Sequence, residues 1–582
     1  MCGIIGVICK NSIAGRVAYE GLKRLDYRGY DSWGLAVKND GLLIYKRTGK
    51  ITNPPRKMFC GFCAIGHTRW ATHGKISVRN AHPHVSQNEK IAVVHNGIIE
   101  NFQELREFLA KKGFSFSTET DTEVIPMLIE LYLSKNLCFR EAVRKALLHL
   151  KGSYAIVAMS ELHNSLIGAR RGSPLVAGFA NGTFLLASDM QAIAPYATKA
   201  MFLEDSELIE INHEAKVYDI ETGKQIKKPI KKIDLTLHSA DKRGFEHYML
   251  KEIYEQEQAI RNASLQSNAL IEKVTKLIKQ AERVFIIGCG TSMHAAMLGS
   301  YFFASIASIQ ANAILASEFQ NFLNLVNKRT VVISLSQSGE TADVLEAVKS
   351  AKQKGAKIIS IVNVVGSSLT RISDATIMMN AGPEICVLAT KSYLAQLSIL
   401  YLLANSLIKR HEQAKKELCE AAGLVPAIIK ANESKAKRLA KKLKNAKSIF
   451  VIGKRENAIT ALEAALKIKE VSYIHAEGFA SAELKHGTIA LIEKNVPVIA
   501  FASDAGDESI TNAIEAKSRG GFIIGVSSER AKCFDRLFTV PKSKLFSLLS
   551  IIPIQLLAYY LALSRNLDPD KPRNLAKSVT VK

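Results

Sequence analysis

Cysteine and acidic residues are scarce in this sequence. Nine cysteines in 582 residues are too few for a disulfide scaffold of the secreted kind. No signal peptide is evident, because Met1-Cys2-Gly3 leads directly into an apolar run, so we expect a cytoplasmic protein with reduced thiols. Lys and Arg number 78 against 54 Asp and Glu, and the net charge of +24 favours anionic partners without determining the fold.

Complete metal-binding and membrane-spanning patterns are also missing. Cys60 and Cys63 form a CxxC pair, but no second pair and no HxxxH follows, so we predict no metal site. The uncharged stretch 545–564 is long enough to cross a bilayer, yet it contains proline and glutamine and resembles a second uncharged stretch at 392–408. A duplicated helix that is apolar on all sides is better explained as the buried helix of a duplicated domain.

The second half of the chain contains a duplication with an offset of 165 residues. The strand-like run that ends at Gly288 is matched by the run that ends at Gly453, and Gly355, which precedes another apolar run, is matched by Gly520. Each copy alternates strands with helices, and its strands are continuous β-branched runs, which is typical of a parallel sheet covered on both faces. We therefore predict two doubly wound α/β domains in tandem.

The first 235 residues have short strands, polar turns and few helices, a pattern that predicts a layered α+β domain. We expect helices at 101–112 and 122–134, with Asp121 as the N-cap of the second. The basic segment 224–232 contains proline and is predicted to be an extended linker. The expected strands are 3–8, 34–37, 42–46, 64–67, 91–95, 154–160, 165–170 and 183–187.

Four motifs follow Cys2 in order through the first domain. They are Tyr-Arg-Gly-Tyr-Asp-Ser (27–32), His-Thr-Arg-Trp-Ala-Thr-His-Gly (67–74), His-Asn-Gly-Ile-Ile-Glu-Asn (95–101) and Glu-Thr-Asp-Thr-Glu (119–123). This set resembles the class II glutamine amidotransferase domain, in which the amino-terminal residue is the nucleophile. The resemblance covers about residues 2–220 and implies the amino-terminal-nucleophile fold.

The chemistry of that family accounts for several of these residues. Hydrolysis of a glutamine amide needs a thiolate, a base and donors for the oxyanion. If Met1 is removed, Cys2 becomes the amino terminus, and its own α-amine, with a reference pKa of about 7.7–8.0, can serve as the base. The Asn96 side chain and the Gly97 backbone N–H suit the oxyanion, and Gly97 lets the backbone approach the substrate without a Cβ.

The substrate's charged groups call for partners of opposite charge. Arg69 suits the α-carboxylate of glutamine and Asp121 suits its α-ammonium, although in isolation each would more simply be a surface arginine and a helix cap. By the resemblance, Trp70, Thr72 and His73 also belong to the glutamine site. Trp70 resembles the family's gate on an internal route for ammonia.

In the first copy of the duplication, two turns connect a strand to a helix. The turn Gly288-Cys-Gly-Thr-Ser292 lacks the third glycine of a dinucleotide turn, because Met293 stands there, so we exclude a nicotinamide site. The turn Ser-Gln-Ser-Gly-Glu-Thr at 336–341 opens a predicted helix at 342–354 and offers hydroxyls and N–H groups to a phosphate monoester; as a bare pattern it is equally an N-cap turn. In its duplicated frame it resembles the sugar isomerase (SIS) domain.

The second copy has different chemistry. Its corresponding turn, Ala-Ser-Asp-Ala-Gly-Asp at 502–507, is acidic, so we expect one phosphate site per chain. Glu463, Lys467 and Glu470 share one face of a helix-favouring segment. Alone, they would be a solvated ion-pair stripe. The titratable residues that follow them are His475, Glu477, Glu483 and His486. Together these groups provide both proton donors and acceptors.

The run through His486 and the carboxyl end at 568–581 resemble the isomerising glutamine–fructose-6-phosphate aminotransferase family. Together with the amidotransferase domain, this resemblance covers nearly the whole chain. It implies conversion of fructose 6-phosphate and glutamine into glucosamine 6-phosphate and glutamate, the first step of amino-sugar synthesis. It also implies a homodimer that needs no cofactor and no metal and binds neither nucleic acid nor membrane.

The resemblance implies a role for each matching residue. Glu470 would move the proton between C1 and C2 of the sugar, His486 would assist ring opening, and Lys577 would form a Schiff base or close the tail. Lys467 would neutralise enolate charge, and Glu463 would orient its neighbours. The residues expected to contact the sugar phosphate are Ser292, Ser336, Gln337, Ser338, Thr341, Val387 and Ala576.

The resemblance also divides the chain. It implies an amidotransferase domain at 2–235, a first SIS domain at 236–415 that binds the sugar phosphate, a second SIS domain at 416–565 and an active-site tail at 566–582.

Some positions depart from the family, and they keep other hypotheses open. Ala389 lacks a hydroxyl near the expected sugar site, Trp33 replaces a small residue near the glutamine pocket, and Leu250 replaces a glutamine. The alternative is a related sugar-phosphate aminotransferase or deglycase acting on a different ketose phosphate. A rival from another class is a nucleic-acid-binding protein, because Lys and Arg form a run without acids at 435–447. No aromatic residue interleaves that run, which favours a solvated helix face.

Overall fold

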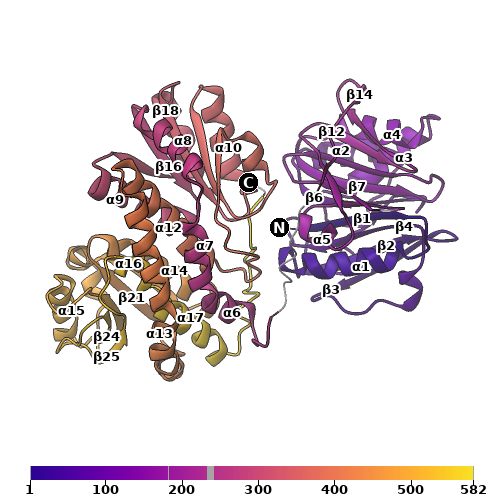
Figure 1. The fold of residues 1–582 in the computed structure, drawn as a ribbon. Coiled ribbons are helices and arrows are strands. Elements are labelled where there is room, and N and C mark those ends of the chain that lie inside the picture. Colours follow the sequence, from indigo (N-terminus) through magenta and orange to yellow (C-terminus); the bar gives the residue numbers. More distant parts are fainter. Residues whose placement is uncertain (1, 181, 233–241, 581–582) are drawn as a thin grey trace. The chain divides into compact units, whose positions relative to one another are not determined.

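The structure is a computed structural model and describes residues 2–180, 182–232 and 242–580. The described residues form two compact units, the first from Met1–His238 together with Ala576–Lys582, and the second from Ser239–Leu575. Each unit has its own sheets (Figure 1). Each also has its own hydrophobic cores.

The first unit contains two antiparallel sheets. The strands of the eight-stranded sheet, in spatial order, are β15 (Lys231–Lys232), β11 (Lys199–Phe202), β9 (Val176–Ala180), β10 (Thr183–Ala187), β1 (Gly3–Cys9), β4 (Cys63–Arg69), β2 (Ser32–Lys38) and β3 (Leu42–Thr48). Those of the seven-stranded sheet are β14 (Gln225–Ile226), β13 (Ala215–Asp219), β12 (Glu207–Ile211), β8 (Leu166–Arg171), β7 (Gly152–Ser160), β6 (Ile91–Ile99) and β5 (His84–Val85).

The two sheets stack between two layers of helices. Alternation along β1 shows why: Ile4 contributes to the core between the sheets, whereas Ile5 and Val7 contribute to the core under the helices α1 (Ala14–Leu25) and α5 (Met190–Ile193). On the other side of the stack, the seven-stranded sheet packs against α2 (Phe102–Ala110), α3 (Val124–Leu133) and α4 (Phe139–Leu147) (Figure 1). The predicted layered α+β fold is confirmed.

Two local predictions in this unit are wrong. Asp121 does not cap α3, because the helix begins at Val124 and the Asp121 carboxylate instead accepts a hydrogen bond from the Ile99 backbone N–H at 2.8 Å. The segment 224–232 is not simply a linker, because β14 and β15 pair with β13 and β11 at the edges of the two sheets. An extended basic segment has free N–H and C=O groups, and here they complete sheet edges.

The second unit contains two five-stranded sheets with the same order and only parallel pairs. The first sheet has the order β17 (Ala311–Leu315), β16 (Arg283–Gly288), β18 (Thr330–Ser336), β19 (Lys357–Val362) and β20 (Ala375–Met378). The second has the order β22 (His475–Ala480), β21 (Ser448–Gly453), β23 (Pro497–Phe501), β24 (Phe522–Ser527) and β25 (Arg536–Thr539). The predicted tandem of doubly wound domains is confirmed.

The helix that follows the first strand of each copy has the same length and the same 165-residue offset in both copies. Helix α9 (Thr291–Ala307) and helix α14 (Glu456–Ser472) are 165 positions apart at both ends. Each follows a residue with positive φ, Gly290 (φ 54°, ψ −126°) and Arg455 (φ 53°, ψ −128°). Every position of α9 therefore has a counterpart in α14.

The apolar stretches are core helices. Helix α12 (Lys391–Leu407) is buried along nearly its whole length. The stretch Phe546–Ser564, which comprises α16 (Phe546–Leu549) and α17 (Ile552–Ser564), is long and apolar enough to span a membrane, but 89% of its apolar window is buried in the protein. The other helices of this unit are α6 (Tyr248–Tyr254), α7 (Gln256–Ser264), α8 (Asn268–Lys279), α10 (Ala342–Gln353), α11 (Ser368–Ile372), α13 (His411–Leu443) and α15 (Ser509–Ser518).

Candidate active sites

Cys2 immediately precedes the central strand β1 and is surrounded by backbone donors and acceptors. The Trp70 backbone N–H donates to Cys2 Sγ at 3.2 Å, and the thiol lies 3.4 Å from the Trp70 carbonyl oxygen. Asn96 Nδ2 donates to the Cys2 carbonyl oxygen at 2.9 Å. Burial raises the pKa of the Cys2 thiol, although the Trp70 N–H and the Arg69 charge act in the opposite direction. The thiol therefore needs a base to become a nucleophile at neutral pH.

Asn96 and Gly97 lie on β6. The hydrogen bond from the Asn96 side chain to the Cys2 carbonyl oxygen shows that Asn96 lies beside Cys2. Gly97 has φ 128°, and a Cβ at this position would lie 1.9 Å from the Ser153 carbonyl oxygen on β7. Glycine is thus required by the packing of the neighbouring strand, and this requirement is separate from the substrate approach expected from the sequence.

Arg69 ends β4 and is 3% exposed. Its guanidinium donates to the carbonyl oxygens of His73, of Gly74 at 3.2 Å and of Lys75 at 3.4 Å. The arginine therefore holds the loop that follows Trp70 and carries Thr72. In that loop the Trp70 ring packs edge-on against Tyr30, with centroids 6.0 Å apart.

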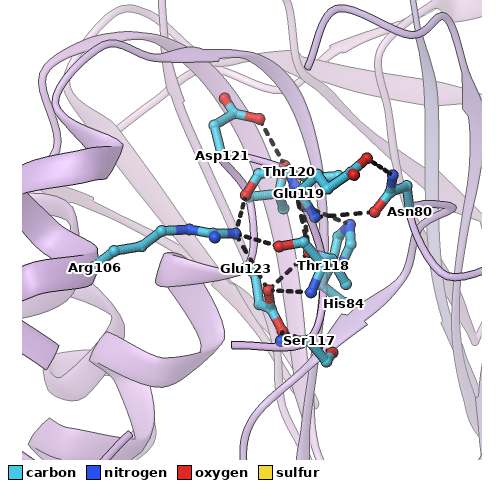
Figure 2. Close-up of polar contacts among 10 residues, drawn as sticks. Asn80, His84, Arg106, Ser117, Thr118, Glu119, Thr120, Asp121 and Glu123 are labelled. Atoms are coloured by element: carbon cyan, nitrogen blue, oxygen red, sulfur yellow. Dashed lines mark hydrogen bonds and ion pairs between the residues drawn. The ribbon is translucent and has the colours of Figure 1, made fainter. Parts of the chain in front are cut away.

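Figure 2 shows how the turn that carries Asp121 is held. The Glu123 carboxylate accepts from the backbone N–H groups at positions 117 and 118, at 2.8 and 2.9 Å. Arg106 donates to the carbonyl oxygens at positions 118 and 120, at 2.6 and 2.9 Å. Asn80 and Glu119 exchange two hydrogen bonds of 2.9 and 3.0 Å. Asp121, 4% exposed, is thus fixed from both sides of the turn.

A second candidate site lies in the second unit, at the carboxyl ends of β16 and β18. In the strand order of the first copy this is the topological switch point, where α/β sheets bind ligands. Ser292 follows β16 and its hydroxyl accepts from Gln396 Nε2 at 2.9 Å. After β18, the hydroxyls of Ser336 and Thr341 lie 2.9 Å apart at the start of α10.

The turn between those hydroxyls depends on Gly339 and Glu340. Gly339 has φ 66°, and a Cβ would lie 2.1 Å from Ser367 Oγ. The Glu340 carboxylate accepts from the Ser368 backbone N–H at 2.7 Å, which directs it toward the start of α11. Within the turn, the Gly339 N–H donates to the Ser336 hydroxyl at 3.0 Å and the Glu340 N–H donates to the Ser338 hydroxyl at 3.1 Å.

In the second copy the corresponding turn is capped by its own acid. Asp507 accepts from the backbone N–H of Ser503 at 2.9 Å, from the Ser503 hydroxyl at 3.2 Å and from the backbone N–H of Ser509 at 2.8 Å. A carboxylate occupies the donors that a phosphate would need. This geometry agrees with the expectation of a single phosphate site.

The charged face of α14 is buried in contact with the first copy. Lys467 and Glu463 are both 0% exposed, and Lys467 Nζ lies 3.3 Å from Glu463 and 2.7 Å from Glu470. Lys467 also donates to Thr291 Oγ1 at 2.9 Å, and Thr291 donates to Glu463 at 3.1 Å. The stripe is therefore a closed network that joins α14 to α9.

His294, on the first turn of α9, completes this network. Its Nδ1 lies 2.7 Å from Glu463 Oε2. Burial alone would raise the pKa of Glu463, but the charge of Lys467 and the hydrogen bond from His294 lower it. Burial would likewise lower the pKa of Lys467, but the two carboxylates raise it. The network holds these groups in their charged forms.

The loop 387–390 contacts the same network. Lys467 Nζ donates to the Ala389 carbonyl oxygen at 3.4 Å. The Val387 backbone N–H donates to the Asp570 carbonyl oxygen at 3.2 Å. The buried Glu384 carboxylate accepts from the Thr390 N–H at 3.0 Å and anchors the end of the loop.

The structure does not bring every expected residue to the network. His486, at the end of a short 3-10 helix, is exposed, as are His475 and Glu477. Ala576 and Lys577 are grouped with the first unit. The Trp33 side chain, 1% exposed, packs in the core under α1.

Sequence reasoning missed two histidines, His67 and His294. His67 lies within 2.9 Å of the His95 carbonyl oxygen and 3.1 Å of Asn96 Oδ1. Both occur inside or beside a motif that was already noted, and that is the only local signal they give. Within the described residues, no group of three or more His, Cys, Asp or Glu could hold a metal ion.

Comparisons with known proteins follow this division. The SIS domain family matches residues 277–406 and 442–565, and the glutamine amidotransferase domain family matches residues 67–195. The glutamine–fructose-6-phosphate aminotransferases [isomerizing] of Thermococcus kodakarensis and Pyrococcus horikoshii are each 44% identical to this chain, over 100% of both sequences. That of Methanothermobacter thermautotrophicus is 41% identical over 100% of both sequences.

A solved structure matches more than half of the chain. The C-terminal domain of glucosamine-fructose-6-phosphate aminotransferase from Francisella tularensis covers 57% of this chain and 100% of its own, with 33% identity and a TM-score of 0.53.

Proposed function

The chain belongs to the family of isomerizing glutamine–fructose-6-phosphate aminotransferases, and from that premise we propose how its residues carry out the reaction. The enzyme converts fructose 6-phosphate and glutamine into glucosamine 6-phosphate and glutamate. The reaction has two parts, hydrolysis of an amide and amination with isomerisation of a sugar. The two candidate sites divide these parts between them.

Glutamine is hydrolysed at Cys2. With Met1 removed, the α-amine of Cys2 takes the thiol proton, and the sulfur attacks the side-chain amide carbon. The oxyanion that forms accepts hydrogen bonds from Asn96 Nδ2 and the Gly97 N–H. Ammonia then leaves, and water hydrolyses the thioester to glutamate. Asn96 already lies 2.9 Å from the Cys2 carbonyl oxygen, which supports this assignment.

The rest of the glutamine is held by groups around Cys2. Arg69 and Asp121 bind its α-carboxylate and α-ammonium, and Thr72 and His73 line the loop that covers it. Trp70, whose backbone contacts the Cys2 sulfur, gates the transfer of ammonia to the sugar site. A dry passage is needed because free ammonia in neutral water is mostly protonated and not nucleophilic.

The phosphate of fructose 6-phosphate binds in the first copy of the duplication. Its oxygens accept hydrogen bonds from the Ser336 and Thr341 hydroxyls and from the N–H groups at the start of α10. Helix amino termini bind other phosphates in the same way. Gln337, Ser338 and Ser292 complete this site, and Val387 and Ala576 contact the sugar.

The acid–base groups come from the second copy. Lys577 condenses with the C2 carbonyl of the opened sugar and releases water. Ammonia then adds to C2 and displaces the Lys577 amine, which gives the imine. Glu470 then removes a proton from C1 and returns it to C2, which gives the 2-amino aldose. Lys467 neutralises charge on the enolamine, Glu463 holds Lys467, His486 assists ring opening, and Lys577 activates the C2 carbonyl as a Schiff base.

The observation that carries this proposal is the buried network of Glu463, Lys467 and Glu470, joined to α9 through Thr291. The decisive experiment supplies glutamine and fructose 6-phosphate together and quantifies glutamate and glucosamine 6-phosphate. We expect equal amounts of both products, and Cys2→Ala should abolish glutamate release. Consumption of glutamine without amination of any phosphorylated ketose would overturn the proposal.

The assembly is a homodimer in the cytoplasm. The exposure of His486 in the single chain supports the dimer. Because His486 does not join the charged network of its own chain, it can contribute to the sugar site of a second copy. Sedimentation of the purified protein tests the assembly. The domain boundaries at 235, 415 and 565 belong to the same proposal.

A different ketose phosphate is the second candidate substrate, and Ala389 is the observation that favours it. Ala389 adjoins Lys467 through its carbonyl oxygen and offers no hydroxyl there. Turnover compared across ketose 6-phosphates separates the two candidates. We propose that nucleic acid is not a partner, since no aromatic residue interleaves the basic run at 435–447. Two of its lysines contact their own chain: Lys442 lies 3.7 Å from the Phe522 ring centroid, and Lys435 Nζ donates to the Thr539 hydroxyl at 3.2 Å.

A further inference from the structure

The first unit contains a buried cluster of four histidines that the proposed reaction does not use. Its members are His67, His82, His84 and His95. The His67 and His82 rings stack with centroids 4.0 Å apart, and the His82 and His84 rings meet edge-on at 4.6 Å. Burial lowers the pKa of all four, to about 3 for His67, so the imidazoles are neutral at physiological pH. Of these four histidines, only His67 makes a hydrogen bond between its side chain and the side chain of a glutamine-site residue, Asn96.

Hydrogen bonds determine which ring nitrogen of His67 carries its proton. His67 Nε2 lies 2.9 Å from the His95 carbonyl oxygen and 3.1 Å from Asn96 Oδ1. A backbone carbonyl oxygen can only accept, so Nε2 donates. A neutral ring carries one N–H, and both oxygens share it.

The same reasoning fixes the direction of the Asn96 amide. The Cys2 carbonyl oxygen, 2.9 Å away, can only accept, so the end of the amide that faces Cys2 is the NH₂ group. The oxygen of the amide then faces the His67 N–H. A flipped amide would place its oxygen against the Cys2 carbonyl oxygen and its NH₂ against the His67 N–H, and both hydrogen bonds would be lost.

We propose that His67 is a positioning residue for glutamine hydrolysis: its Nε2–H holds the Asn96 amide with the NH₂ group toward Cys2 before the oxyanion forms. The inference rests on the proposed glutaminase reaction and adds the group that orients its oxyanion donor. As the bond from sulfur to the amide carbon forms, the carbonyl π electrons move to oxygen, and that oxygen accepts from Asn96 Nδ2. A donor that is already oriented costs no reorganisation at this step.

The test compares three single variants in the full-length protein. His67→Phe keeps a flat ring against His82 but removes the N–H, and His67→Gln keeps an N–H donor on a flexible side chain. His84→Gln is the matched control, because His84 is equally buried but bonds Thr120 at 3.2 Å and not Asn96. Loss of one oxyanion donor lowers kcat by about 10²–10³-fold, and loss of its orientation should cost about 10–100-fold. We expect this loss of kcat for His67→Phe with little change in KM, partial recovery in His67→Gln and no loss of kcat in His84→Gln.

Alkylation of Cys2 separates positioning from a general disturbance of the site. Iodoacetamide reacts with the thiolate by displacement of iodide and forms no oxyanion. We expect His67→Phe to keep the wild-type rate of Cys2 alkylation while it loses glutaminase kcat. The rate is measured on the amino-terminal peptide after digestion, because Cys60 and Cys138 are exposed and also react. If alkylation slows in parallel with kcat, His67 has only a structural role and the proposal is overturned.

A double-mutant cycle with Asn96 completes the test. In an Asn96→Ala background, His67→Phe should lower kcat by less than about threefold, because the group that it orients is already absent. A full additional loss would mean that His67 acts elsewhere, and this would also overturn the proposal. Failure of the proposed function gives a different result, because the wild-type protein itself would then release no glutamate in a Cys2-dependent way.

Discussion

The two α/β copies of the second unit share one backbone plan but place different chemistry on it. Helices α9 and α14 have matched ends, and both follow a residue with φ near 54°. Yet the positions that hold Glu463 and Lys467 in α14 hold Leu298 and Phe302 in α9, and all four are buried. One copy uses its helix to fill a core, whereas the other uses the same positions for a charged network.

The turns that follow β18 in the first copy and β23 in the second also differ. Each copy has an acid directly after the turn glycine, Glu340 in the first and Asp507 in the second. The longer Glu340 reaches the N–H of Ser368 on α11, whereas the shorter Asp507 folds back onto Ser503 and caps its own turn. The two acids thus make different contacts, and under the proposed function only the first copy binds a phosphate.

Removal of the charged network should have the largest effect. We expect Glu470→Gln to lower glucosamine 6-phosphate synthesis about 10³-fold, because general acid–base groups contribute about 10²–10⁴-fold. The matched control is Ser305→Gln, at the same position of α9, which is exposed and should leave synthesis unchanged. Product is quantified at saturating substrate, with glutamate release measured separately. Synthesis above a tenth of wild type in Glu470→Gln would argue against its role.

Conversion of the second helix toward the first should separate stability from activity. Lys467→Met leaves Glu463 buried without its cation, and removal of one partner of a buried pair typically costs about 3–5 kcal/mol. The double variant Glu463→Leu with Lys467→Phe recreates the apolar pair of α9. It should regain most of the lost stability but remain inactive in glucosamine 6-phosphate synthesis. Hydrogen exchange of peptides across α14, converted to opening free energies, provides the measurement. A double variant as unstable as Lys467→Met would show that the two helix environments are not equivalent.

The turn comparison predicts a smaller effect. In Glu340→Asp the carboxylate is too short to reach Ser368 and should cap its own turn, as Asp507 does. We expect KM for fructose 6-phosphate to rise about tenfold, since a hydrogen bond to a charged group contributes about 1.5–3 kcal/mol. The reciprocal variant, Asp507→Glu, should leave KM unchanged. Initial rates over a range of fructose 6-phosphate test both, and equal values of KM for Glu340→Asp and wild type would contradict the argument.

The smallest effect concerns the residue before each helix. Arg455 adopts the backbone conformation of Gly290, which residues with a Cβ adopt at a cost of about 1–3 kcal/mol. Its ion pair with Glu508, 3.6 Å long and exposed, contributes little. After the entropy cost of a new glycine, Arg455→Gly should stabilise α14 by about 1 kcal/mol. Slower hydrogen exchange at the start of α14 is the expected result, and faster exchange would refute it.

In the second unit, the inner strands were predictable from the sequence, and the edge strands were not. The β-branched runs of β16, β18, β19, β21, β23 and β24 indicate strands buried on both faces, and all six form central or inner strands of the two sheets. The strands β17, β20, β22 and β25 lie at the sheet edges and are only partly buried, unlike the inner strands. Their assignment needs the neighbouring strand, which local sequence does not reveal.

The candidate sites show the same limit. Residues whose chemistry is apparent locally, such as Glu463 with Lys467 or Ser336 with Thr341, lie together in the structure. His294 was missed because its partner Glu463 is 169 positions away. Asp121 was misassigned as a helix cap for a similar reason, since the N–H that it accepts from lies 22 positions earlier in the chain. Contacts across the fold, and not residue type, decide these cases.

The position of β1 in the middle of its sheet determines how late in translation Cys2 reaches its final surroundings. Ile5 pairs with Ala187 of β10, so the strand beside Cys2 gains one of its two neighbours only after almost 190 residues have been made. At a ribosomal speed of about 5–20 residues per second, this takes roughly ten to forty seconds. Until β10 has been made, β1 can pair only with β4, and the edge of the strand that follows Cys2 stays unpaired on its other side.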